Sequence, residues 1–140
     1  MPISADYVLE EAAPSPTQYC ALRERAGMTP RSERQATGAI AGSWAFYRVT
    51  HVPTGEVVAM GRVIGDGAWY FNVADMAVLP EHQRQGLGNA VLTALLNKIR
   101  AEADDGAYVT LIADAPGQPL YLKHGFEKKL EGSVGMAQFL

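Results

Sequence analysis

The stretch Asp75–Gly88, DMAVLPEHQRQGLG, decides the fold, because it leads from an apolar run through a polar loop into an amphipathic helix. Before the loop, the run Trp69–Leu79 is rich in aromatic and apolar residues and ends at Pro80, which predicts a central strand buried on both faces. A further apolar run, Tyr108–Ala113, predicts a strand after the helix, so the sheet should hold at least one parallel pair. The helix itself, Gly86–Gly106, is predicted from apolar residues that recur at helical spacing, namely Leu87, Val91, Leu92, Leu95, Leu96 and Ile99.

The residues before Trp69 predict a short strand, two short helices and an antiparallel meander. Proline and serine residues precede the first helix, Ser32 is placed to cap the second, and turn residues separate the strands of the meander. The predicted elements are a strand at Tyr7–Leu9, helices at Thr17–Ala26 and 32–41, and strands at Trp44–His51 and Val57–Ile64.

Near the other end, the pattern predicts a short helix at Pro119–His124 and a strand entered through Gly125-Phe126. Val134–Phe139 alternates weakly and is expected to form an exposed edge strand, which would allow a homodimer. Together these elements predict an α/β (α+β) fold with a mixed, mostly antiparallel, twisted sheet and helices on both faces. At 140 residues, the chain has the size of a single domain, 1–140.

Composition and charge exclude several classes of function. The net charge of -3 and the absence of a Lys/Arg run argue against a nucleic-acid partner. With Cys20 as the only cysteine and no ligand spacing among the three histidines, we expect neither a disulfide nor a metal site. No apolar run is long enough to cross a bilayer, and the N-terminus lacks a signal-peptide pattern, so we expect no membrane association and a cytoplasmic location.

The loop Gln83–Gly88 suggests either an anion site or glycines that serve only a tight strand-to-helix turn. The start of a helix presents unpaired backbone N–H groups and partial positive charge, and glycines let the backbone approach a phosphate closely. A Walker loop does not fit, because Asn89-Ala90 follows the last glycine where Lys and Ser/Thr are required. A dinucleotide fingerprint does not fit either, since Val91 stands at the third glycine.

Two motifs resemble the GNAT N-acetyltransferase superfamily. Its motif Gln/Arg-x-x-Gly-x-Gly/Ala is matched by Gln83, Gly86 and Gly88, with Val78 and Pro80 at the customary offsets upstream. A second family element follows at the right distance, in the sequence LYLKHGF that ends at Phe126. The resemblance implies a GNAT-like sheet with splayed central strands and transfer of an acetyl group from acetyl-CoA.

The resemblance also implies how acetyl-CoA would bind. The backbone of residues 76–78 would pair with the pantetheine arm like an added strand, and the amides at the helix start would hold the pyrophosphate. A β-bulge is expected at Asp75-Met76, where a backbone N–H near Met76 would polarise the thioester carbonyl. The cofactor-binding candidates are Met76, Ala77, Val78, Gln83, Arg84, Gln85, Gly86, Leu87, Gly88, Asn89, Asp114 and Tyr121.

Tyr121 matches the family tyrosine that stands near the cofactor sulfur, which implies that its hydroxyl protonates the departing thiolate. The alternative is that Tyr121 only packs against the cofactor. The sequence departs from the family at two nearby positions, since Asp114 replaces a frequent Asn and Gly117 a frequent Ala. A carboxylate lacks the donors of an amide, so a cofactor contact by Asp114 is in question.

The acceptor amine must lose a proton before it attacks. Asp75 is a charge inside an apolar run, which predicts either a catalytic base or substrate anchor, or a structural carboxylate paired with an arginine. Alternation places Asn72 and Ala74 on one face and Asp75 on the other, unless a bulge changes this. Asn72 cannot act as a base, which favours a water relay.

Substrate-binding candidates come from the first two helices, their loop and the facing strands. They are Arg31, Tyr70 and Asn72, with Trp44 and Phe71 as further walls of the acceptor site. Arg31 would hold a carboxylate or phosphate, or else be a solvated charge. The predicted reaction is acetylation of a small-molecule primary amine, and the alternatives are a protein lysine or N-terminal acetyltransferase, a non-catalytic CoA-binding module, or a plain phosphate-binding domain.

Overall fold

A five-stranded mixed sheet organises the first part of the chain, in a computed structural model that describes residues 2–128 and 132–140. The strands lie in chain order; neighbours are antiparallel except for the last pair, which is parallel. The predicted mixed, mostly antiparallel sheet is thereby confirmed. Its strands are β1 (Tyr7–Glu10), β2 (Ala45–His51), β3 (Glu56–Gly65), β4 (Tyr70–Val78) and β5 (Tyr108–Thr110).

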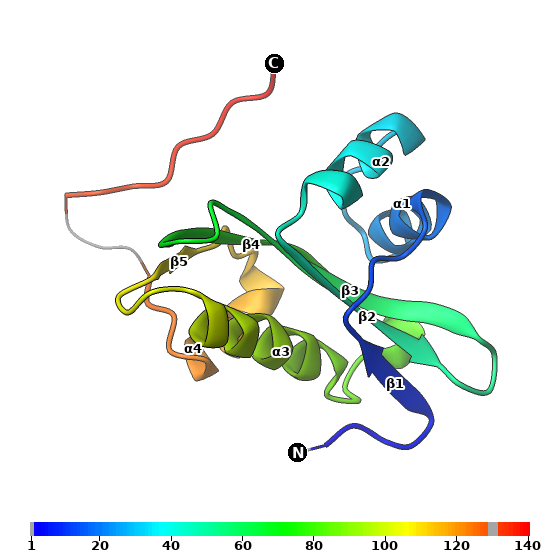
Figure 1. The fold of residues 1–140 in the computed structure, drawn as a ribbon. Coiled ribbons are helices and arrows are strands. Elements are labelled where there is room, and N and C mark those ends of the chain that lie inside the picture. The colour runs from blue at the N-terminus through cyan, green and yellow to red at the C-terminus, as the bar shows by residue number, and fades with distance from the viewer. Residues whose placement is uncertain (1, 129–131) are drawn as a thin grey trace. The chain divides into compact units, whose positions relative to one another are not determined.

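Helices cover both faces of this sheet, as predicted. The helices α1 (Pro16–Arg25) and α2 (Glu33–Gly42) lie on one side and α3 (Leu87–Glu102) on the other (Figure 1). The apolar stripe of α3 is buried against the sheet, and removing this area from water is the main force that holds the helix there. None of the helices in the described residues is both long and apolar enough to span a bilayer.

The chain divides into two compact units, the first ending at Thr110 and the second running from Leu111 to Leu140. The second unit contains α4 (Gln118–Lys123), preceded by the 3-10 turn η2 (Ala115–Gly117). A similar turn in the first unit, η1 (Pro80–His82), leads from β4 towards α3.

One predicted helix end and two predicted strands are wrong. The helix expected to continue to Gly106 ends at Glu102, where two aspartates follow Ala103 and act against the negative end of the helix dipole. The strands expected after Gly125 and at Val134–Phe139 are absent from the described residues of the second unit. An extended segment becomes a strand only by pairing, and weak alternation with a glycine at 135 provides little reason to pair. Residues 129–131 lie outside the described residues.

Candidate active site

A β-bulge interrupts the pairing of the two central antiparallel strands. Met60 lies opposite Ala77 and Arg62 opposite Ala74, so that Gly61 of β3 faces two residues of β4, Asp75-Met76. Asp75 adopts a left-handed backbone with φ of 55°, which is uncommon for a residue with a side chain. The bulge predicted from the sequence is confirmed at the predicted residues.

The bulge turns Asp75 towards the side of the sheet that carries α1. Its carboxylate accepts a hydrogen bond from the Tyr19 hydroxyl and forms an ion pair with the Nη1 of Arg23, both from α1. A second ion pair joins it to Nε of Arg62, at 2.6 Å. Only 6% of the Asp75 side chain is exposed. Plain alternation would have placed this charge on the opposite face, towards α3.

The surroundings of Asp75 keep it ionised. Burial raises its pKa, but the hydrogen bonds from Tyr19 and Arg62 and the positive charges of Arg62 and Arg23 outweigh burial, so the pKa is lowered from its ordinary value. Tyr19 shows the reverse effect, because burial and its hydrogen bond to Asp75 raise its pKa to about 12. A carboxylate that binds three donors is a poor proton acceptor. The geometry therefore favours the structural interpretation of Asp75, and its role as a base remains a prediction.

Three residues of this cluster were not predicted, namely Tyr19, Arg23 and Arg62. The signal for Arg62 was present, since it is a charge inside the apolar run Val57–Ile64 and mirrors Asp75 in the adjacent run. Tyr19 and Arg23 stand four residues apart and therefore share one face of α1. Both are buried, with 3% of Tyr19 and 9% of Arg23 exposed. Opposite charges in neighbouring apolar runs are the pattern that would have found the pair.

The edge of β4 towards β5 is open along the second half of the strand. Pairing with β5 ends at Asn72 and Thr110, whereas β4 continues to Val78. The Asn72 amide closes the paired part by donating to Thr110 Oγ1, at 2.9 Å. Beyond this point, backbone groups of β4 at residues 73–78 have no β5 neighbour in the described residues. This is the stretch in which residues 76–78 are predicted to pair with the pantetheine arm.

The start of α3 differs from the starts of α1 and α2. Both of those helices begin with a full capping box, Ser15 with Gln18 and Ser32 with Gln35. By contrast, α3 begins at Gly86, which has a left-handed φ of 77° and provides no side-chain cap. The first-turn N–H groups of a helix have no partner within the helix, so an anion can satisfy them here.

The loop before α3 also fits an anion. Gln83, Arg84, Gln85 and Gly86 are exposed, and Arg84 has a left-handed φ of 62°. The Gln83 side chain donates from Nε2 to the carbonyl of Val78 at 3.4 Å, which ties the loop to the end of β4. Exposed loop residues, an uncapped helix start and a nearby arginine are features that suit a pyrophosphate.

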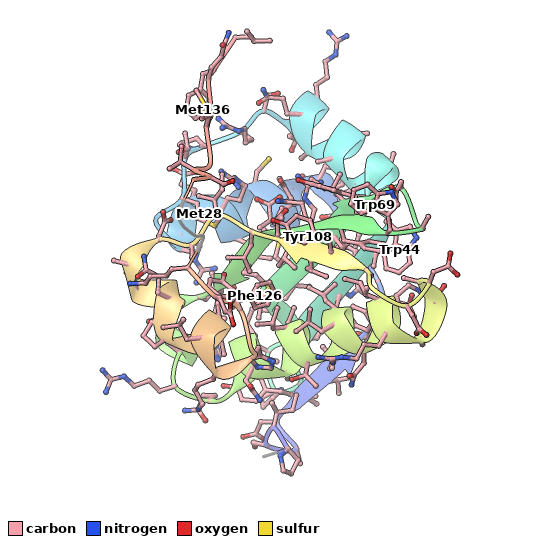
Figure 2. The ribbon with its side chains drawn as sticks, turned by 90° about the vertical axis from the view of Figure 1, so that its left-hand side faces the viewer. Met28, Trp44, Trp69, Tyr108, Phe126 and Met136 are labelled. Atoms are coloured by element: carbon pink, nitrogen blue, oxygen red, sulfur yellow. The ribbon has the colours of Figure 1, made fainter. Side chains whose placement is uncertain are left out.

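The predicted acceptor residues separate into two groups. Tyr70 is 44% exposed and meets Trp69 and Tyr108 edge to face, at centroid distances of 5.4 and 5.6 Å. Figure 2 shows Trp69 and Tyr108 on the side of the sheet that carries α1 and α2. Asn72 follows Tyr70 on this face by alternation. These residues therefore line the side of the sheet onto which Asp75 also turns.

The prediction that Trp44 and Phe71 line the acceptor site is wrong. Phe71 is fully buried, and the Trp44 ring packs against it with centroids 4.9 Å apart. Lys98 of α3 lies over the Trp44 ring, so both aromatic residues belong to the opposite face. Arg31, from the loop between α1 and α2, donates to the carbonyl of Pro30 at 3.1 Å and is half-buried.

Within the second unit, Tyr121 lies beside both positions that depart from the family pattern. Burial raises its pKa, and the negative charge of Asp114 raises it further. A Cβ added at Gly117 would lie 3.0 Å from the Tyr121 ring, so the glycine lets the ring approach the backbone closely. The Tyr121 hydroxyl therefore stays protonated at neutral pH. Asp114 is exposed and does not cap the turn that it precedes.

Comparison with known proteins places these features in a family context. A family model described as acetyltransferase (GNAT) domain matches residues 42–128, more than half of the chain. The chain is 33% identical over 81 residues to "GCN5-related N-acetyltransferase 2, chloroplastic" of Arabidopsis thaliana, an alignment that covers 58% of this chain and 31% of that protein. It is equally similar to "Histone acetyltransferase TAP1" of Glycine max, of which it covers 34%. The chain thus spans about a third of the length of these curated relatives.

Among solved structures, a probable acetyltransferase of unknown function from meticillin-resistant Staphylococcus aureus is similar over almost its whole length. The TM-score is 0.89 at 32% identity, and the alignment covers 96% of this chain and 99% of the other. A GNAT family acetyltransferase from Streptococcus pneumoniae shares the fold, with a TM-score of 0.78, 24% identity and coverage of 96% and 98%.

Proposed function

Because the chain belongs to the GNAT acetyltransferase family and is therefore an acyltransferase, we propose that it transfers an acetyl group from acetyl-CoA to the primary amine of a small molecule. The observation that carries the proposal is the combination, in one continuous segment, of a bulged strand with an open edge and an uncapped helix start. The family generally uses acetyl-CoA, and this segment fits both its extended arm and its phosphates.

Each part of the segment has a binding task. The first-turn amides of α3, from Leu87 onwards, hold the pyrophosphate, and Arg84 adds positive charge beside it. The open backbone of β4 at residues 76–78 pairs with the pantetheine arm. When bound, acetyl-CoA supplies a thioester whose carbonyl carbon is open to attack by an amine. The backbone N–H near Met76 orients and polarises the carbonyl oxygen.

Proton movements complete the assignment. Tyr121 gives its hydroxyl proton to the departing sulfur, in line with the family resemblance and with a phenol that is protonated at neutral pH. The amine loses its proton to water, because Asn72 is an amide and Asp75 is occupied by three donors. Asp75 is then a positioning residue: it fixes the bulge, and the bulge places the backbone N–H near Met76.

An amine on a protein is the second candidate acceptor. The printed name of the relative from Glycine max, a histone acetyltransferase, supports this alternative, although this chain covers only 34% of that protein. The two candidates differ in the acceptor that an assay would reveal, not in the assignment of the acetyl-CoA site.

A thiol-release assay with acetyl-CoA tests the proposal. We expect release that depends on a small primary amine, and a fall in kcat of about a hundredfold or more in Tyr121→Phe with little change in KM for acetyl-CoA. Tyr47→Phe, which also removes one hydroxyl but on β2, outside the candidate site, is the matched control. Release only with peptides would establish the second candidate, and an unchanged kcat in Tyr121→Phe would exclude the acid role.

A further inference from the structure

The buried cluster around Asp75 contains more positive than negative charge. Arg23 and Arg62 contribute two guanidinium groups, and Asp75 is the carboxylate that both bind. Their side chains are only 10% and 14% exposed. A buried charge without a counter-ion is costly, so a net charge of this kind is expected where a ligand of opposite charge binds.

The two arginines differ in how many of their guanidinium nitrogens form hydrogen bonds. Arg23 donates from Nη1 to Asp75, and from Nε and Nη2 to the carbonyl of Thr29 at 3.0 and 2.9 Å. Arg62 donates from Nε to Asp75, and from Nη1 towards Ser43 Oγ at 3.3 Å and the carbonyl of Ala39 at 3.5 Å. Within the described residues, Nη2 of Arg62 makes no hydrogen bond. Among the guanidinium nitrogens of the cluster in the described residues, Nη2 of Arg62 is therefore the one that makes no hydrogen bond.

This donor lies on the face of the sheet assigned to the acceptor. Arg62 stands directly across from Ala74, and Ile64 directly across from Asn72. Partners in an antiparallel pair share a face, so Arg62 lies on the same face as Asn72 and Tyr70. It is also next to the bulge, because its Nε binds the carboxylate of Asp75. An anion bound at Nη2 would thus lie beside the strand that orients the thioester.

We propose that the acceptor is an amine that also carries an anionic group, a carboxylate or a phosphate, which Arg62 binds through Nη2. The inference rests on the proposed function and names the chemical class of its acceptor. A guanidinium is planar, permanently charged and suited to both anions. Binding of one such anion balances the cluster, with two cations and two anions. Neutral amines of the same shape lack this interaction.

The test compares kcat/KM for matched acceptors in the thiol-release assay. Phosphoethanolamine against ethanolamine tests a phosphate, and β-alanine against β-alaninamide tests a carboxylate, with rates corrected for the fraction of free amine. We expect the anionic member of at least one pair to be favoured by about ten- to a hundredfold. The pair that shows the preference identifies the anion.

Two variants assign the preference to Arg62. Arg62→Gln should remove the preference, whereas Arg100→Gln, which removes an exposed arginine from α3, should keep it. A transferase that treats both members of each pair alike overturns the inference and leaves the proposed function standing. Absence of release with every amine overturns the proposed function, and the inference with it. Even if Arg62→Gln does not fold, the comparison in the unmodified protein decides whether the acceptor carries an anion.

Discussion

Asp75 illustrates what one residue contributes at the boundary between stability and function. Asp75 is the left-handed residue of the bulge, and its carboxylate binds side chains of α1 and β3. In the sequence, Asp75 is recognisable as a charge in an apolar run. The sequence could not reveal the partners Tyr19 and Arg23, because contacts between a helix and a distant strand leave no local pattern. The face to which Asp75 turns also depended on the bulge.

Replacing Asp75 by Asn should destabilise the protein and slow transfer. The change leaves two buried guanidinium groups without their counter-ion, and breaking a buried ion pair in this way costs about 3–5 kcal/mol. Urea unfolding measures the loss, with Asp104→Asn as the control for an exposed carboxylate on the same unit. A loss below 1 kcal/mol with full activity across pH would contradict the positioning role.

The raised pKa of Tyr19 predicts that the protein loses stability at alkaline pH. Its pKa is about 12 in the folded protein against an ordinary 10.0. Between these values the unfolded chain releases the proton while the folded chain keeps it, so the free energy of unfolding falls as pH rises. The fall can reach about 2–3 kcal/mol, since one pKa unit corresponds to about 1.4 kcal/mol. In urea titrations between pH 9 and 12, Tyr19→Phe should show a flatter profile; an identical slope in both proteins would refute the assignment.

At the scale of elements, strong patterns predicted the fold well. The apolar stripe of α3, the serines placed before α1 and α2 and the apolar runs between turn residues gave elements of the right type and order. Ends were less predictable, because the last turn of a helix depends on charges and backbone angles rather than on periodicity. Tyr70 and Phe71 were both assigned to the acceptor face, although neighbours on a strand must face opposite ways. That error could have been avoided from the sequence.

The contact between α3 and the bulge depends on the absence of a side chain at Gly61. A Cβ there would lie 2.7 Å from Val91 and 3.2 Å from Leu95, and would also collide with the sulfur of Met76. Gly61→Ala should therefore lower stability by about 1–3 kcal/mol through overpacking, and should reduce the transfer rate by displacing Met76.

Gly38 offers a control for this substitution. An added Cβ meets nothing within 4 Å at this position in α2, so Gly38→Ala should be neutral or slightly stabilising. Thermal unfolding of both variants makes the comparison. Equal effects of the two substitutions would show that close packing at the bulge is not what holds α3 in place.

For the whole molecule, the family match extends over both compact units, since residues 42–128 run across the division at Thr110. The candidate cofactor site could be predicted because its strand, loop and helix are consecutive in the chain. The buried cluster around Asp75 could not, because it draws single residues from α1, β3 and β4. Their distances along the sequence are large and their spacing follows no motif.

Calorimetric titration with acetyl-CoA, compared with acetyl-pantetheine, tests most directly whether the start of α3 holds the pyrophosphate. The two ligands share the thioester and the arm, and only acetyl-CoA carries the phosphates together with the adenosine. We predict saturable binding of acetyl-CoA to one site, and binding of acetyl-pantetheine that is weaker by at least about tenfold. Equal affinity for the two ligands, or no saturation by acetyl-CoA at millimolar concentration, would contradict the assignment.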